Sequence, residues 1–410
     1  MAYNRKAGDK LKIGILTLHS QTNYGGVLQA YALQEVLIRF GYDVQIVDRW
    51  FDERNGGLRG IVASRSIVSW IKFIVRALLG FGDAANYIRH VRTARKLHFL
   101  LKRTEYSFCH WKDVPSDFDF DLLVVGSDQV WNVDIQGKEL PYLLEGAPVI
   151  PAIAYAASFG MKQVPIGLQA RYKEGFARFS QISVREKEAC AIVDAAGLKA
   201  EHVADPTLLA GLSDWQRIMA LSRPPKKRAK RKLVCYLIHD PLGFVVSELA
   251  RFAKENSCEV EIFFGTPCTR LPENLSELIA ISSGAIRAFF AKNIHTRATA
   301  TPDEFLVEIA DADMVLSDSF HALMFATIFK KNIRVLKPRQ NRGVAGFSRL
   351  SEFVDSFIET PTMYDDFDKA LLSFRSDPQT RYYESKISDF RKESLRWLKS
   401  SIQTAVGESR

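Results

Sequence analysis

The feature that most restricts the fold is an alternation of short apolar stretches with helical stretches, which occurs in each half of the sequence. Strand–helix–strand repeats of this kind form parallel sheets covered by helices. The expected strands comprise residues 12–18, 42–48, 120–126, 149–156 and 181–185 in the first half and 233–238, 258–264, 314–316 and 333–336 in the second. The main expected helices comprise residues 27–40, 186–196, 244–254, 321–329 and a helix that begins at Thr301. The sequence therefore predicts an α/β protein with two Rossmann-like domains that face a cleft.

The length of the chain also indicates more than one domain. A chain of 410 residues is too long for one ordinary hydrophobic core. Residues 223–232 are rich in proline, lysine and arginine, so this segment reads as part of a linker. The expected divisions are an N-terminal domain over 11–210 with a basic helical insertion at about 53–115, a linker over 211–232, a C-terminal domain over 233–365 and a helical tail over 366–410.

The positive charge of the chain is concentrated in the insertion. Residues 58–103 hold ten lysines and arginines and one acid, Asp83, which equals the net charge of +9 of the whole chain. A basic amphipathic helix here could lie on an anionic membrane surface. Alternatively, a helical insertion would pack on its own domain and leave its charges in solvent, and we favour this interpretation. No nucleic-acid partner is expected, because the basic residues alternate with aliphatic ones rather than with stacking aromatic rings.

The cysteines and the N-terminus indicate the compartment. The five cysteines form no CxxC pair and no cluster with the spacing of zinc ligands. The first ten residues are polar and lack the apolar core of a signal peptide. We therefore expect a cytoplasmic protein that uses neither a metal nor a cofactor. Peripheral contact with the inner face of the membrane is the alternative that the basic insertion leaves open.

Two residues at strand ends are the main candidates for chemistry. His321 stands where a buried strand becomes a helix, a position where α/β sheets bind ligands and where backbone N–H groups favour an anion. A histidine there can transfer a proton near neutral pH, although it could instead be a structural histidine satisfied by Asp318. Arg185 ends an apolar strand and could bind carboxylate or phosphate, or simply pair with Glu186 or Glu188.

Two loops at strand ends are candidates for substrate binding. Asn23, Gly25 and Gly26 precede a helix, where glycines let a ligand approach the backbone, although an ordinary turn would have the same composition. The second loop, residues 126–132, directly follows an apolar strand. Its candidate hydroxyl-binding side chains are those of Ser127, Asp128, Gln129 and Asn132. Trp131 could offer an apolar face to a sugar ring, or could lie in the core beside a helix cap.

Taken together, the ordered motifs resemble the polysaccharide pyruvyl transferase family over nearly the whole chain. Its landmarks here are residues 23–33, 126–132, 156–160, 183–186, 205–207, 317–322 and 348–350. The resemblance implies a GT-B-like fold and transfer of pyruvate from phosphoenolpyruvate onto two hydroxyls of a sugar, as a cyclic ketal. The acceptor would be a glycan or lipid-linked oligosaccharide of exopolysaccharide or capsule assembly, bound on the N-terminal side. The resemblance implies an acid/base role for His321, an anion-clamping role for Arg185, and substrate contacts that include Ser158.

One position departs from the family pattern. Members of the family can carry an arginine two residues before the histidine, as in an Arg-Leu-His turn, but this chain has Ser319 and Phe320 there. Loss of a bidentate cation should weaken anion binding unless another group replaces it. Ser319 at the helix N-terminus could hold phosphate in part, and the candidate replacement cations are Arg349, Arg342 and Lys337.

Two alternatives of other classes remain open at this point. A GT-B glycosyltransferase that uses a nucleotide sugar would have the same two-domain pattern, and a glycan- or anion-binding protein without catalysis would need no complete clamp. The acceptor sugar, its hydroxyl pair, the ketal stereochemistry and the oligomeric state are left open by the sequence.

Overall fold

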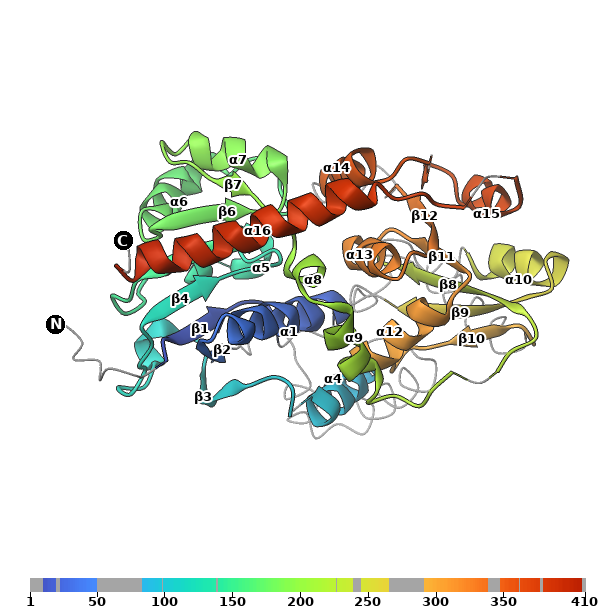
Figure 1. Ribbon diagram of the computed structural model, residues 1–410, viewed down its shortest axis with the longest axis horizontal. Coiled ribbons are helices and arrows are strands. Elements are labelled where there is room, and N and C mark those ends of the chain that lie inside the picture. The colour runs from blue at the N-terminus through green and yellow to red at the C-terminus, as the bar shows by residue number, and fades with distance from the viewer. Residues whose placement is uncertain are drawn as a thin grey trace, which may run out of the picture.

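The computed structural model of the chain describes residues 10–19, 23–49, 83–97, 99–137, 139–225, 227–238, 245–264, 291–337, 347–360, 362–376 and 379–407. Two sheets lie side by side, and all paired strands within them are parallel (Figure 1). Helices cover both sheets, so the predicted α/β fold of two parallel-sheet domains is confirmed.

The N-terminal sheet has the strand order β3-β2-β1-β4-β5-β6-β7. Its strands are β1 (Lys12–Leu16), β2 (Asp43–Arg49), β3 (Arg103–Phe108), β4 (Leu122–Val125), β5 (Ala152–Ala157), β6 (Gln181–Val184) and β7 (Glu201–His202). The order reverses between β1 and β4, and a crevice forms at such a point at the carboxyl ends of the strands. The loops after β1 and β4 are the two that the sequence predicts to bind substrate.

The C-terminal sheet has the strand order β10-β9-β8-β11-β12-β13. Its strands are β8 (Arg231–Leu237), β9 (Cys258–Phe264), β10 (Ile294–Thr296), β11 (Met314–Ser317), β12 (Asn332–Leu336) and β13 (Met363–Tyr364). Here the order reverses between β8 and β11. At this second switch point the chain leaves β11 and enters the helix that carries His321. The main candidate residues of the sequence therefore lie at the switch points of the two sheets.

The helices fall close to the expected positions, but two elements, one helix and one strand, lie in segments where the sequence did not predict them. They are α1 (Tyr24–Arg39), α4 (Asp83–Leu97), α5 (Val133–Gln136), α6 (Gln169–Phe176), α7 (Lys187–Asp194), α8 (Pro206–Leu209), α9 (Leu212–Met219), α10 (Val246–Glu255), α12 (Pro302–Asp311), α13 (Phe320–Ile328), α14 (Phe347–Phe357), α15 (Phe367–Ser376) and α16 (Glu384–Ala405). The expected linker contains α9, and the expected helical insertion contains an edge strand, β3. This strand is short and only partly buried, so its apolar pattern is weak.

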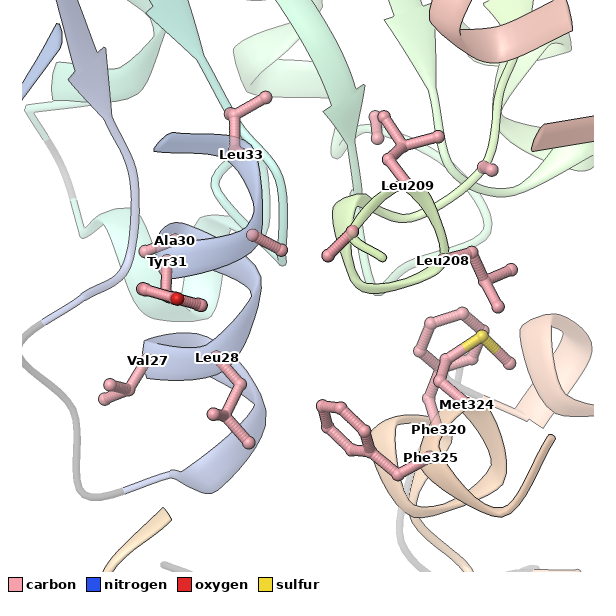
Figure 2. Close-up of a cluster of buried hydrophobic side chains, with 14 of the residues drawn as sticks. Val27, Leu28, Ala30, Tyr31, Leu33, Leu208, Leu209, Phe320, Met324 and Phe325 are labelled. Carbon is pink, nitrogen blue, oxygen red and sulfur yellow. The ribbon is translucent and has the colours of Figure 1, made fainter. Parts of the chain in front are cut away.

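Helix α1 lies between the two domains and is buried except for a few residues near its C-terminus. One side of the helix packs against the N-terminal sheet, and other sides face α8 and α13. Figure 2 shows Leu28, Leu208 and Phe325 among the apolar side chains that these three helices contribute. Apolar side chains on several faces of α1 favour this burial. The hydrophobic core therefore continues from one domain into the other.

Tyr24, in the first turn of α1, enters an aromatic cluster of the C-terminal domain. Its ring stacks on Phe305 with 4.5 Å between centroids, and its edges meet Tyr236 and Phe263 at 5.5 and 5.9 Å. Burial raises the pKa of Tyr24 to about 12, and its hydroxyl has no hydrogen-bond partner among the described residues. The ring therefore stabilises the contact between the domains through apolar packing.

Helix α4, in the basic insertion, binds the C-terminal domain through its basic side chains. Lys96 Nζ lies 2.7 Å from Asp303 Oδ2, and Arg92 Nη2 lies 2.6 Å from Glu304 Oε1. Arg89 donates to the carbonyl oxygen of Ala298 at 2.6 Å. Arg92 and Lys96 are therefore paired with the acidic first turn of α12, which differs from the expected solvated charges, whereas Arg95 of the same helix is exposed. Residues 58–82, which carry the membrane hypothesis, lie outside the described residues.

Helix α16 runs back from the C-terminal domain across the N-terminal one (Figure 1). Phe390 stacks on Phe357 at 5.2 Å, Ser394 Oγ accepts from the backbone N–H of Ala204 at 2.8 Å, and Trp397 meets Tyr155. The domains are thus joined by α1, α4 and α16. Within the described parts of the chain, no helix is long and apolar enough to cross a membrane.

A test of the domain contact compares two substitutions of Tyr24. Tyr24→Ala should lower the free energy of unfolding by about 3–5 kcal/mol, since a large buried ring is lost. Tyr24→Phe should be neutral or stabilising, because an unpartnered buried hydroxyl costs about 1–3 kcal/mol. Denaturant unfolding followed by circular dichroism measures both. Equal stability of the two variants would mean that the ring does not hold the domains together.

Candidate active site

The candidate site lies where the two switch points meet between the domains. The N-terminal domain contributes the start of α1, the loop after β4, the end of β6 and the segment between β7 and α8. The C-terminal domain contributes the starts of α13 and α14. Two helices, α1 and α13, therefore begin at the same site, and helix N-termini favour negative charge.

His321 is held against the opposite domain. Its side chain is 7% exposed, and its imidazole touches Gly25 in the first turn of α1, where a Cβ would overlap the ring. Its Nε2 atom lies 3.9 Å from Asp205 Oδ2 and has no hydrogen-bond partner among the described residues. Burial lowers the pKa of His321, while Asp205 and Asp128 raise it in part. A buried imidazole with a free nitrogen is suited to proton transfer.

Arg185, at the end of β6, is buried among three carboxylates. Its guanidinium lies 3.1 Å from Asp205, 3.3 Å from Glu186 and 3.6 Å from Asp128, and 4.7 Å from the centre of the Phe320 ring. Burial alone would lower the pKa of Arg185, but these carboxylates raise it well above its ordinary value. These contacts orient the guanidinium toward the domain boundary. Arg185 is therefore buried, and it does not form the simple surface ion pair with Glu186 that was one of the two sequence interpretations.

Asp205 is the residue of the site that sequence reasoning missed. In the sequence, Asp205 belongs to one of the motifs that resemble the family, but no function is predicted for it. Its Oδ1 accepts from the N–H and the hydroxyl of Thr207 at 2.9 and 2.7 Å, which fixes the carboxylate at the start of α8. Its Oδ2 accepts from Arg185 and from Ser127 Oγ and faces His321. Burial would raise the pKa of Asp205, but His321, Arg185 and Thr207 lower it.

Arg349, on α14, is the second guanidinium of the site. Its Cζ lies 5.8 Å from the centre of the Phe320 ring, so both arginines approach the same aromatic side chain. When the side-chain amide of Gln129 is turned with its oxygen toward the guanidinium, that oxygen accepts from Arg349 Nη1 at 2.7 Å and from Nη2 at 3.2 Å. Burial first and Arg185 second lower the pKa of Arg349. Of the other candidate cations, Lys337 pairs with Asp365 at 2.9 Å, and Arg342 lies outside the described residues.

The remaining predicted residues mostly support the site. Ser127 is bound to Asp205, and Ser158 Oγ donates to Glu186 at 2.6 Å. Asn23 caps α1 and Asn132 caps α5, while Gly26 lies beside the Asp128 carboxylate. Asp128 has φ 67°, a left-handed conformation that aspartate tolerates better than most residues. Ser319 Oγ accepts from Ala322 N–H and so caps α13, the helix that begins with Phe320.

Two sequence interpretations change with the structure. Trp131 has no exposed surface, and its ring packs among Phe159, Phe176 and Phe179, so it lies in the core rather than facing a sugar. The loop turns this ring inward because its indole N–H donates to the carbonyl oxygen of Tyr142. Asp318 accepts from Ile238 N–H at 2.6 Å, and the carboxylate that faces His321 is Asp205 instead.

A pocket between the domains gives the two arginines a common cavity. Arg185, Asp205 and Arg349 are among its polar lining residues. Its other lining residues are His202, Val203, Leu208, Phe320, Met324, Glu352, Phe353, Phe357 and Phe390. Across the described ranges, no group of three or more histidine, cysteine or acidic side chains could hold a metal ion. The carboxylates near His321 instead bind arginine.

Comparison with known proteins identifies the family. The family model of polysaccharide pyruvyl transferases matches residues 23–338, most of the chain. The chain belongs to the polysaccharide pyruvyl transferase family. The matched range includes Gly25, Arg185, Asp205 and His321, while Arg349 lies beyond it. Membership implies a transferase that acts on a polysaccharide.

Solved structures show the fold of this family member. The UDP-GlcNAc 2-epimerase from Neisseria meningitidis aligns with a TM-score of 0.54 at 10% identity, over 97% of this chain and 100% of that chain. The UDP-GlcNAc 2-epimerase from Methanocaldococcus jannaschii aligns with a TM-score of 0.51 at 12% identity, over 96% and 100%. These neighbours have the GT-B-type arrangement, and the low identities show likeness of fold alone. No curated protein matches the sequence.

A substitution at Gly25 tests the contact between the domains at the site. Gly25→Ala should displace the His321 imidazole, because the added Cβ would occupy the position of the ring. Gly167→Ala is the matched control, since a Cβ there meets nothing within 4 Å. The NMR signal of the His321 imidazole should move in the first variant and stay in the second, while circular dichroism shows both folded. An unmoved signal in Gly25→Ala would contradict the contact.

Proposed function

We propose that this family member transfers pyruvate from phosphoenolpyruvate onto a sugar of a polysaccharide or lipid-linked oligosaccharide and forms a cyclic ketal. The observation that carries the proposal is the buried imidazole of His321 in one site with two guanidinium groups, where its Nε2 has no hydrogen-bond partner among the described residues. The donor has a carboxylate, a phosphate and a carbon that must gain a proton. The three side chains match these three requirements.

The chemistry assigns a task to each group. His321 donates a proton to the methylene carbon, which becomes a methyl group and leaves the central carbon electron-poor. One sugar hydroxyl adds to that carbon and loses its proton. The bond between carbon and the phosphate oxygen then breaks, phosphate leaves, and the second hydroxyl adds and loses its proton. The starts of α1 and α13, together with the arginines, would hold the negative charge of carboxylate and phosphate.

Arg349 is proposed as the cation that replaces the arginine missing at Ser319. Arg185 already faces three carboxylates, so much of its charge is compensated. Arg349 is bound by the neutral amide of Gln129, and its Nε has no hydrogen-bond partner within the described residues. A guanidinium without a carboxylate in contact retains more of its attraction for an anion. Ser319 is used as the cap of its own helix.

The acceptor is proposed to bind from the N-terminal side. Asn23, Gly26 and Asp128 lie at the carboxyl edge of that sheet, and Asp128 can accept from a hydroxyl while it faces Arg185. This side also carries the basic insertion. We also propose a cytoplasmic location. A lipid-linked acceptor would bring the protein to the inner face of the membrane.

The assay follows phosphate release and the mass of the acceptor in the presence of phosphoenolpyruvate and candidate glycans. The unmodified protein should release phosphate and add pyruvate to the sugar. His321→Ala should lower kcat by about 10²–10⁴-fold, the usual range for loss of a general acid. Arg349→Gln should weaken donor binding, whereas Lys337→Gln, whose lysine pairs with Asp365, should leave it unchanged.

Two outcomes would contradict the proposal. Some structural neighbours were solved with UDP-GlcNAc or UDP, so a nucleotide sugar belongs in the same assay. Sugar transfer from it, without turnover of phosphoenolpyruvate, would make the protein a glycosyltransferase. Glycan binding that His321→Ala leaves intact, without turnover of either donor, would make it a binding protein.

A further inference from the structure

We propose that Asp205 is a positioning residue with two roles. It sets the protonation of His321 from the opposite domain, and it holds Arg185 in place. This inference deepens the proposed function and rests on it for its catalytic consequence. Its physical content, a carboxylate coupled to an imidazole across the domain boundary, can be measured without turnover.

The first step of the argument is the rigidity of the carboxylate. Asp205 has no exposed side-chain surface, and its Oδ1 is fixed by two hydrogen bonds from Thr207. Its Oδ2 is bound by Ser127 Oγ at 3.2 Å and by Arg185 Nη1 at 3.1 Å. A carboxylate held by these four groups cannot rotate away when its neighbour changes charge.

The second step is its direction. The Nε2 of His321 lies 3.9 Å from Oδ2, within ion-pair distance, and has no hydrogen-bond partner among the described residues. On the other side the ring touches Gly25, which carries no charge. The charged groups that act on His321 are Asp205, Asp128 from the loop after β4, Arg185 from β6 and Arg349 from α14. Two carboxylates and two guanidinium groups thus act on the ring, and the Asp205 carboxylate has the largest effect among them.

The third step is the sign of the effect. Burial lowers the pKa of His321, and Asp205 opposes this by stabilising the imidazolium. The proposed reaction begins with a proton on His321. Its rate should be full at low pH and fall as the pH rises through the pKa of that imidazole. Removal of the Asp205 charge should move the fall to lower pH.

Glu186 offers a matched control for Asp205. Both carboxylates bind Arg185 at similar distances, 3.3 Å for Glu186 and 3.1 Å for Asp205, and both are buried. Asp205 lies 3.9 Å from the imidazole, whereas Glu186 is not among the charged groups that act on it within the described residues. A role confined to holding Arg185 predicts the same behaviour for both variants, whereas coupling to His321 predicts a difference.

The experiment is an NMR titration of the imidazole signals in the full chain, with the His321 signal assigned by its loss in His321→Ala. In Asp205→Asn the midpoint for His321 should lie at lower pH than in the unmodified protein, and in Glu186→Gln it should stay. The rate profile with phosphoenolpyruvate should shift in the same way. An equal midpoint in Asp205→Asn and the unmodified protein, or equal shifts in both variants, would overturn the inference.

A measurement on the unmodified chain covers the case in which Asp205→Asn does not fold. Nitrogen chemical shifts of the neutral imidazole report which nitrogen carries the proton. A carboxylate opposite Nε2 predicts a proton on Nε2, and a proton mainly on Nδ1 would contradict the inference. If the titration behaves as expected but phosphoenolpyruvate is not consumed, the coupling stands and the proposed function fails.

Discussion

The contact between Gly25 and His321 is the constraint on which the rest of the site depends. It places an imidazole from the C-terminal sheet against a helix of the N-terminal sheet, with no room for a Cβ between them. The buried helix α1, the aromatic cluster around Tyr24 and the ion pairs of α4 all maintain this contact. The proposed proton-transferring group is therefore in place only when both domains are packed together.

The charges of the site explain how buried cations can be kept there. An isolated buried charge is costly unless it is paired and hydrogen-bonded. Arg185 is compensated by Asp128, Glu186 and Asp205, and the Phe320 ring covers it. Arg349 has the amide of Gln129 instead of a carboxylate. The two arginines consequently differ: Arg185 is held by carboxylates, and Arg349 is the one that we propose to bind an anion.

Sequence reasoning located the residues that stand at strand ends and missed those defined by long-range pairing. His321, Arg185 and Gly25 follow apolar strands, so their place at the sheet edge was predictable. Asp205 follows a strand of only two residues. Its place in the site depends on Arg185 and His321, which lie 20 and 116 positions away in the sequence, and no local pattern indicates these contacts. Trp131 also lies in a loop at a strand end, but its ring turns into the core, and position at the sheet edge alone did not indicate this direction. The docking of α4 depends on the acids of α12, far along the chain.

The most direct test of the central claim is the fate of a solvent proton. The reaction is run with phosphoenolpyruvate and an acceptor glycan in D2O, and the product is analysed by mass spectrometry. If His321 delivers a solvent-derived proton to the methylene carbon, the new ketal methyl group should carry one deuterium, and His321→Ala should form little or none of this product. A pyruvylated product without deuterium, or one formed equally well by His321→Ala, would contradict the account.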